Sequence, residues 1–251
     1  MRRRFFVDKF EANAAKLRGD AAEHLGRVLR AEPGQLYELS DGGSVWLARV
    51  ARLSKAKGDK SEIDFELVEP IPAHEPRLRL HVAISIVKFD RFEWCLEKAT
   101  ELGVAEITPL AAARTDKPLI AAAAKRHARW EKILLESAQQ SRQLRLPILN
   151  AAIRPAEAFI QADAGLKILL SERPDAKPIR QILENANASN VALAFGPEGG
   201  WTDDEIIAAR RAGFAEASLG ENILRTETAV IAAITILRFA PKREPETTDE
   251  H

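Results

Sequence analysis

Apolar and polar residues alternate in short runs between residues 35 and 69. The run 36–39 leads into Asp41-Gly42-Gly43, and the alternation resumes over 45–50. An Asp-Gly pair between two such runs is a strong hairpin signal. A third run follows over 63–68. Short strands joined by tight turns predict a small barrel or half-barrel in this part of the chain.

A proline-rich segment, 70–76, marks a change of pattern and is the best linker in the chain. Beyond it, apolar runs of strand length alternate with stretches of helical periodicity. Strands are predicted over 78–87, 104–110, 166–171, 191–195 and 215–219, and helices over 92–102, 119–144 and 229–239. Alternating strands and helices predict an α/β domain with a mostly parallel sheet. The tail from Pro241 to His251 is polar, and we expect it to be disordered.

Two glycine-containing loops follow two of these predicted strands. Gly196-Pro197-Glu198-Gly199-Gly200 comes after 191–195, and 219–225 comes after 215–219. Glycine has no Cβ, so backbone groups can approach a ligand there, and ligands of open α/β sheets bind beyond the carboxyl ends of the strands. Thr202 and Glu205 form a capping box, which predicts a helix directly after the glycines. One loop alone is often only a tight turn, but two in successive units predict a shared ligand site.

Composition and charge restrict the classes of function. The chain has 251 residues, 46% of them apolar, which suffices for one large or two small domains with a core. Its 37 basic and 37 acidic residues balance, so binding to a nucleic acid must rest on a local patch. Residues 114–145 carry eight basic against three acidic side chains. Such a cluster suits phosphate binding, although a solvated helix face has the same pattern.

Several functions are disfavoured because their sequence signals are missing. The single cysteine, Cys95, excludes an internal disulfide and lies on the apolar face of its predicted helix, where we expect a core position. No apolar stretch reaches membrane-spanning length and no signal peptide is visible, so we expect a soluble, cytoplasmic protein without a membrane partner. The histidines lack metal-binding spacing, so no metal is expected. The dinucleotide, P-loop and serine-hydrolase glycine motifs are absent.

Taken together, the motifs resemble those of the RsmE family of SPOUT-class methyltransferases, which methylate N3 of a uridine in 16S ribosomal RNA. The resemblance covers nearly the whole chain, and the order of the motifs makes it specific. The matching segments are Arg3-Arg4-Phe5-Phe6-Val7, 24–30, 88–91, 98–104, Arg129-Trp130, 140–142, 196–200 and 223–229.

The resemblance implies a PUA-like β-barrel RNA-binding domain over residues 1–72 and a SPOUT α/β domain with a trefoil knot over 73–243. A disordered tail would cover 244–251. It also implies a homodimer, S-adenosylmethionine as cofactor, and 16S rRNA of the small ribosomal subunit as partner. The implied cofactor-binding residues are Leu170, Ser171, Phe195, Gly196, Gly199, Gly200, Leu219, Gly220, Ile223 and Leu224.

The implied reaction is in-line transfer of a methyl group to a deprotonated uridine N3. Neutral N3–H is a poor nucleophile, so Arg225 is a candidate for favouring the anionic base electrostatically. Glu198 is the second catalytic candidate, acting on the proton or orienting a loop or the partner subunit. The candidates for RNA contact are Arg3, Arg4, Arg27, Arg30, Arg91 and Arg142.

Two positions depart from the family pattern. Asn222 stands where arginine is usual, and Phe89 stands where glycine is usual. Both changes affect local loop geometry and RNA contacts more than the reaction. Methylation of another RNA, such as tRNA, is the alternative within the same class. Noncatalytic RNA binding is the alternative from another class, and a dinucleotide-dependent oxidoreductase is the most distant one.

Overall fold

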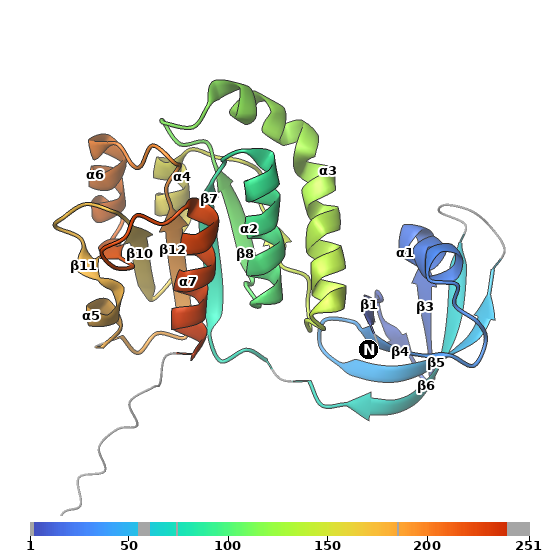
Figure 1. Ribbon diagram of the computed structural model, residues 1–251. Helices are drawn as coiled ribbons and strands as arrows, with labels where there is room; N and C mark the ends of the chain where they lie inside the picture. Colours follow the sequence, from blue (N-terminus) through green and yellow to red (C-terminus); the bar gives the residue numbers. More distant parts are fainter. Residues whose placement is uncertain (1–2, 55–60, 74, 185, 240–251) are drawn as a thin grey trace, which may run out of the picture. The chain divides into compact units, whose positions relative to one another are not determined.

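The computed structural model describes residues 3–54, 61–73, 75–184 and 186–239 (Figure 1). They form two compact units, each assembled from several stretches of the chain. The first contains the chain up to Arg79 together with Leu96–Ile107 and Ala124–Ala151. The second contains Leu80–Cys95, Thr108–Ala123 and the chain from Ala152 onward. The tail predicted to be disordered, 244–251, lies outside the described residues.

A six-stranded sheet with the order β1-β4-β5-β6-β3-β2 belongs to the first unit. Its strands are β1 (Arg4–Phe6), β2 (Phe10–Glu11), β3 (Ala14–Arg18), β4 (Leu36–Ser40), β5 (Val45–Leu53) and β6 (Glu62–Ile71). β1 runs parallel to β4, whereas β4, β5, β6 and β3 pair antiparallel in turn. α1 (Gly19–Glu23) and a π-helical turn, η1 (His24–Val28), lie between β3 and β4. The hairpin predicted at Asp41-Gly42-Gly43 is confirmed, because β4 and β5 pair up to Ser40↔Val45.

Alternation along these strands separates an apolar face from a charged one. Leu17 on β3, Leu39 on β4 and Phe65 on β6 are each at most 2% exposed and share one core cluster. Removing these side chains from water is the main stabilising contribution to the sheet. On the other face, the Lys16 ammonium lies 2.9 Å from the Glu62 carboxylate on the neighbouring strand. The period of two therefore decides which side chains stabilise the core and which remain solvated.

The segment predicted as a linker begins inside a strand. β6 continues through Pro70 and Ile71, which pair with Trp46 and Val45 of β5. Proline has no N–H to donate to a ladder and is tolerated where a strand has a neighbour on one side. β3 lies on the other side of β6 and pairs with it over residues 62–66. The pairing with β3 therefore ends before Pro70. The prediction of a linker from residue 70 was therefore wrong by two residues.

The second sheet has seven strands in the order β11-β13-β10-β12-β7-β8-β9. Its strands are β7 (Arg79–Ser85), β8 (Glu106–Leu110), β9 (Ile148–Leu149), β10 (Leu166–Leu170), β11 (Lys177–Pro178), β12 (Asn190–Phe195) and β13 (Ala215–Ser218). β10 runs parallel to both β12 and β13, β11 runs parallel to β13, and β8 runs parallel to β9. The prediction of an α/β fold with a parallel sheet is confirmed.

The helices are α2 (Phe89–Glu101), α3 (Lys117–Gln140), α4 (Pro155–Gln161), α5 (Ile179–Leu183), α6 (Asp203–Arg211) and α7 (Thr226–Phe239). α2 ends close to the predicted residue 102, because Gly103 adopts a φ of 76° and donates its N–H to the Thr100 carbonyl at 2.9 Å. The prediction that α3 continues to residue 144 was wrong. Arg142 has a φ of 56°, a left-handed conformation that a helix cannot contain.

Helices pack on both faces of the sheet in the second unit (Figure 1). Phe159 of α4 contacts the rings of Trp201 and Phe214, with centroids 5.8 and 5.0 Å apart, and shares a core with Ala192 and Ala194 of β12. The intervening residues of β12 face the other way, where α7 packs against the strand. None of the helices in the described part of the chain is both long and apolar enough to cross a membrane.

Candidate functional site

A cavity of about 870 Å³ lies where β10, β12 and β13 end, within the second unit. Its walls are the loops that follow these strands: 171–176, 196–201 and 219–225. This position beyond the carboxyl ends of parallel strands is where open α/β sheets bind ligands. The ligand site predicted from two loops therefore has a third wall, the loop after β10.

The structure brings most of the predicted cofactor-binding residues together around this cavity. The residues in its walls are Leu170, Ser171, Phe195, Gly196, Gly200, Leu219, Gly220, Ile223 and Leu224. Gly199 is the predicted residue that is not among them, since its missing Cβ faces the Arg114 side chain, 3.3 Å from Cβ of that residue. Both catalytic candidates, Glu198 and Arg225, also line the cavity.

The glycine-rich loop is fixed by the indole of Trp201. The indole Nε1 donates to the Leu170 carbonyl at 2.8 Å, which ties this loop to the end of β10. A Cβ added at Gly196 would lie 3.1 Å from the ring, so the loop passes the indole at a distance that only glycine accommodates without movement. The predicted capping box is confirmed: Glu205 N–H donates to the Thr202 hydroxyl, and the Glu205 carboxylate accepts the Thr202 N–H at 2.9 Å.

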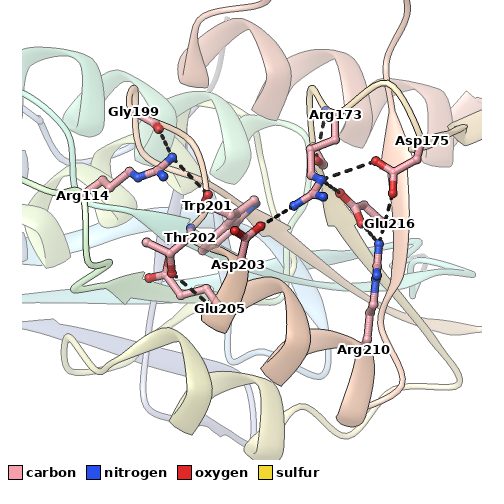
Figure 2. Close-up of polar contacts among 11 residues, drawn as sticks. Arg114, Arg173, Asp175, Gly199, Trp201, Thr202, Asp203, Glu205, Arg210 and Glu216 are labelled. Atoms are coloured by element: carbon pink, nitrogen blue, oxygen red, sulfur yellow. Dashed lines mark hydrogen bonds and ion pairs between the residues drawn. The ribbon is translucent and has the colours of Figure 1, made fainter.

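Arg114 clamps the same loop from the segment after β8. Its Nη1 donates to the Gly199 carbonyl at 2.8 Å and to the Trp201 carbonyl at 3.1 Å (Figure 2). The neighbouring Ala113 N–H donates to the Glu205 carboxylate at 2.9 Å. Sequence analysis placed Arg114 in a basic patch and did not connect it with the glycines. The signal for the connection was a charged residue four positions after the end of a predicted strand.

Glu198 is held by Arg91 of α2. The Arg91 guanidinium forms an ion pair with the Glu198 carboxylate and lies 3.9 Å from the carboxylate of Glu227 on α7. Glu227 is buried and its Oε2 has no hydrogen-bond partner among the described residues. Cys95 is buried nearby, and desolvation together with the Glu227 charge raises the pKa of its thiol to about 12. A thiol with this pKa stays protonated at neutral pH, which is consistent with a core residue and not with a nucleophile.

The wall formed by 219–225 is the most exposed of the three. Gly220 has a φ of 138°, a conformation that favours glycine, and Ile223 is 81% exposed. Asn222 and Arg225 are exposed as well. Within the described residues the Arg225 guanidinium has no ion-pair partner, so its charge is available to a group entering the cavity. Thr226 joins this wall to the glycine-rich loop by donating to the Gly196 carbonyl at 3.4 Å.

The predicted RNA-contact residues are divided between the two units. Arg3, Arg27 and Arg30 are exposed in the first unit, and Arg27 pairs with Glu23 one helical turn earlier. Arg91 lies in the second unit, where it pairs with Glu198 of the cavity wall.

Arg4 and Arg142 share one carboxylate in the first unit. Arg4 is buried, with its Nη2 2.9 Å from the Glu38 carboxylate, and its Nη1 donates to the Arg142 carbonyl at 2.7 Å. The Arg142 guanidinium lies 3.4 Å from the same carboxylate of Glu38. This placement gives Arg4 a structural role, because its charge is withdrawn from solvent and neutralised within the unit.

No group of three or more His, Cys, Asp or Glu side chains arranged to hold a metal ion occurs in the residues that the structure describes. What the cavity offers is apolar side chains, backbone groups at glycines, and a few charged groups at its edge. Such a composition is typical of sites for small organic ligands.

An α/β sheet with a ligand cavity formed by glycine-containing loops is a fold with many functions, and comparison with known proteins gives the class. A sequence profile of the RNA methyltransferase domain matches residues 74–238. The ribosomal RNA small subunit methyltransferase E of Mesomycoplasma hyopneumoniae is 37% identical over 172 residues, covering 68% of this chain and 74% of the relative. The enzyme of the same name from Synechocystis is 34% identical over 217 residues, covering 84% of this chain and 68% of the relative.

A solved structure is similar over almost the whole chain. The crystal structure of a ribosomal RNA small subunit methyltransferase E from Neisseria gonorrhoeae, bound to S-adenosyl methionine, superimposes with a TM-score of 0.81. The two chains are 31% identical, and the match covers 94% of this chain and 97% of the other. The chain belongs to the ribosomal RNA small subunit methyltransferase E family, which confirms the resemblance drawn from its motifs.

Proposed function

We propose that this protein is an S-adenosylmethionine-dependent methyltransferase that modifies N3 of a specific uridine in 16S rRNA of the small ribosomal subunit, in the cytoplasm. The observation that carries the proposal is the cavity at the ends of β10, β12 and β13, which contains the glycine-rich loop and both catalytic candidates. The names of the relatives support small-subunit rRNA as the substrate. The related Neisseria structure supports S-adenosylmethionine as the cofactor.

The residues around the cavity fit this cofactor. Its volume lies within the range of small-ligand sites, roughly 300–1,000 Å³. Leu170, Phe195 and Leu224 would offer apolar surface to the cofactor, and Gly196 and Gly220 would leave backbone groups accessible to its polar parts. When bound, S-adenosylmethionine supplies an electrophilic methyl group on a sulfonium. The protein then has to bind the cofactor, orient it against the base, and activate uridine N3 as the nucleophile.

Arg225 is the group that we assign to activation of the base. Uridine N3 carries a proton in the neutral base, and this proton has to leave before or during methyl transfer. A guanidinium close to the base favours the anionic form of the uracil ring. Arg225 lines the cavity and has no ion-pair partner among the described residues, which supports this role. Glu198 is ion-paired with Arg91, which supports a role in orienting the glycine-rich loop over one as proton acceptor.

The finer features of the fold belong to the same proposal. We assign a PUA-like RNA-binding domain to residues 1–72 and a SPOUT domain with a trefoil knot to 73–243, in a homodimer. The knot is supported by the path of the chain after β13. This strand pairs with β10, yet the next segment returns to β12, where Thr226 bonds to Gly196 and α7 packs. Arg3, Arg27 and Arg30 are exposed and remain the candidates for RNA contact in the first unit.

Transfer of labelled methyl from S-adenosylmethionine tests the function. The substrates are unmodified small ribosomal subunits, naked 16S rRNA and bulk tRNA, and the modified nucleotide is mapped. We expect label at N3 of one 16S uridine. Label on tRNA alone would overturn the rRNA assignment, and a protein that binds the cofactor but transfers no methyl would be a noncatalytic RNA-binding factor.

A matched pair of variants tests the assigned residue. Arg225→Ala should lower kcat by about a hundredfold or more, within the range for loss of an electrostatic group at a reacting centre. Arg211→Ala removes the same charge from an exposed position on α6 that does not line the cavity. Its kcat should remain that of the wild type. Equal effects of the two substitutions would refute the role of Arg225.

A further inference from the structure

The loop after β10 is the third wall of the cavity, and beyond Ser171 none of its residues was predicted to bind the cofactor. It contributes Ser171, Glu172, Arg173, Pro174 and Ala176 to the cavity. The Ala176 N–H donates to the Arg173 carbonyl at 3.0 Å, which closes a turn with proline at its second position. At the start of the loop, the Ser171 N–H donates to the Ala217 carbonyl of β13 at 2.8 Å. One backbone hydrogen bond thus holds the start of this loop against β13, and another closes its turn.

A network of ion pairs then connects the turn to elements behind the cavity (Figure 2). The Arg173 Nη1 lies 2.7 Å from the carboxylate of Asp203, the first residue of α6. Its Nε lies 3.4 Å from Asp175 in the same turn and 3.9 Å from Glu216 of β13. Arg210, in the last turn of α6, lies 2.8 Å from Glu216 and 3.4 Å from Asp175.

The partners of Arg173 lie on elements that adjoin the other two walls. Asp203 begins the helix that directly follows the glycine-rich loop, and Glu216 lies on the strand that leads into the loop 219–225. Arg173 itself belongs to the third wall and lines the cavity. One side chain therefore joins the loop 171–176 to the helix and the strand that adjoin the other two walls.

The buried member of the network depends on Arg173. The Glu216 side chain is only 7% exposed, and its Oε1 has no hydrogen-bond partner among the described residues. The Arg173 guanidinium is the cation that faces this oxygen, while Arg210 pairs with Oε2. Burying a charged group is costly unless a group of opposite charge lies close to it. Loss of Arg173 would leave three carboxylates of this network around a single guanidinium, which favours separation of the turn from α6 and β13.

We propose that Arg173 is a positioning residue that holds the loop 171–176 in the shape that binds S-adenosylmethionine. The proposal rests on the proposed function of the cavity. Arg173 acts through the loop and through its carboxylate partners, and it takes no part in the chemistry. The loop is already ordered in the free protein. Binding of the cofactor therefore does not include the entropic cost of ordering this wall.

Isothermal titration of S-adenosylmethionine into the cofactor-free protein tests this role. Arg173→Ala should raise the Kd by about tenfold. Arg173→Lys, which keeps the charge but not the forked geometry, should lie between this variant and the wild type. The matched control is Arg180→Ala, because Arg180 is exposed on α5 and does not line the cavity. Arg173→Ala with the Kd of the wild type, or an equal rise in Arg180→Ala, would overturn the proposal.

Two further readouts separate positioning from general stability. At saturating cofactor, kcat of Arg173→Ala should stay within about twofold of the wild type, since the chemistry is untouched. The difference in Kd between the two proteins should shrink as NaCl is raised, because salt screens the exposed members of the network. A kcat that falls as much as the affinity, or a difference in Kd that salt leaves unchanged, would overturn the role.

Asp203→Asn gives a test that does not depend on the stability of the arginine variants. Asp203 is 85% exposed, so its substitution leaves the core intact, yet it removes the charge nearest to Arg173. We expect a rise in Kd of about threefold with an unchanged melting temperature. An unchanged Kd in this variant would overturn the proposal. A wild-type protein that does not bind S-adenosylmethionine would instead refute the function assigned to the cavity.

Discussion

Substituting alanine for Gly196 tests the close approach of the glycine-rich loop to Trp201. Gly196 is not among the residues with positive φ, so its backbone accepts alanine, and the obstacle is contact alone. The new Cβ would lie 3.1 Å from Cε2 and 3.2 Å from Nε1 of the indole. The ring is held in place, because it is only 8% exposed and donates to Leu170 at 2.8 Å. Overpacking of such a contact costs about 1–3 kcal/mol, and we expect a loss of about 2 kcal/mol in the free energy of unfolding.

A double-mutant cycle with Trp201→Phe shows whether the indole is the cause. This substitution alone removes one hydrogen bond, whose net contribution to stability is about 1 kcal/mol. It also leaves a small cavity, which lowers the stability by a further 1–2 kcal/mol, roughly. The smaller ring makes room for the Cβ, so Gly196→Ala should cost less than about 0.5 kcal/mol in the Trp201→Phe protein.

Urea unfolding of the cofactor-free variants, followed by circular dichroism, measures these differences. The midpoint should shift while the m-value stays constant, which indicates a change in stability and not in the extent of unfolding. Purely additive losses in the double variant would refute the argument that Trp201 excludes a side chain at position 196.

Three further outcomes follow from other contacts. Arg114→Met removes the donor to the Gly199 carbonyl, so calorimetry should find S-adenosylmethionine bound about tenfold more weakly; unchanged affinity would contradict the clamp. Cys95, whose pKa is raised to about 12 mainly by burial, should resist iodoacetamide at neutral pH until the protein unfolds, and rapid labelling of the folded protein would contradict its burial. A hydrogen bond from Lys16 lowers the pKa of Glu62 below its ordinary value of 4.5. This pair therefore stabilises the folded state above pH 4.5, and the stabilisation is lost as the pH falls through the lowered pKa. Urea titrations from neutral to acid pH should show a shallower decline for Glu62→Gln than for the wild type, and parallel curves would argue against the pair.

The elements that sequence analysis predicted are those with long and regular patterns. The strands around residues 36–53 and 190–195 were found because apolar alternation or continuous apolar runs extend over most of their length. β1, β2 and β3 were not assigned, since they have three, two and five residues and carry too little periodicity. The end of α3 was misplaced because nothing in its composition announces the left-handed conformation of Arg142.

The part of the candidate site that could be predicted is the part formed by glycines in loops. Gly196 and Gly220 stand out in a sequence because few other residues allow their contacts or conformation. Arg114 and Arg173 could not be found in this way. Arg114 lies 85 residues before the carbonyl that it binds, and Arg173 lies 30 residues before Asp203. An arginine in an ion pair across the fold has the same local pattern as an arginine in solvent, so only the tertiary structure distinguishes them.

The order of the strands has a consequence for synthesis of the protein on the ribosome. β10 lies between β13 and β12 in the sheet, although β13 is translated last of the three. A nascent chain that has emerged only as far as α6 thus presents one side of β10 as an unpaired edge, the kind of surface at which chains aggregate. The cavity that we propose for the cofactor also lacks the wall 219–225 at that stage. Under the proposed function, S-adenosylmethionine therefore stabilises only molecules in which residues 219–225 have emerged and closed the cavity, and it does not stabilise shorter nascent chains.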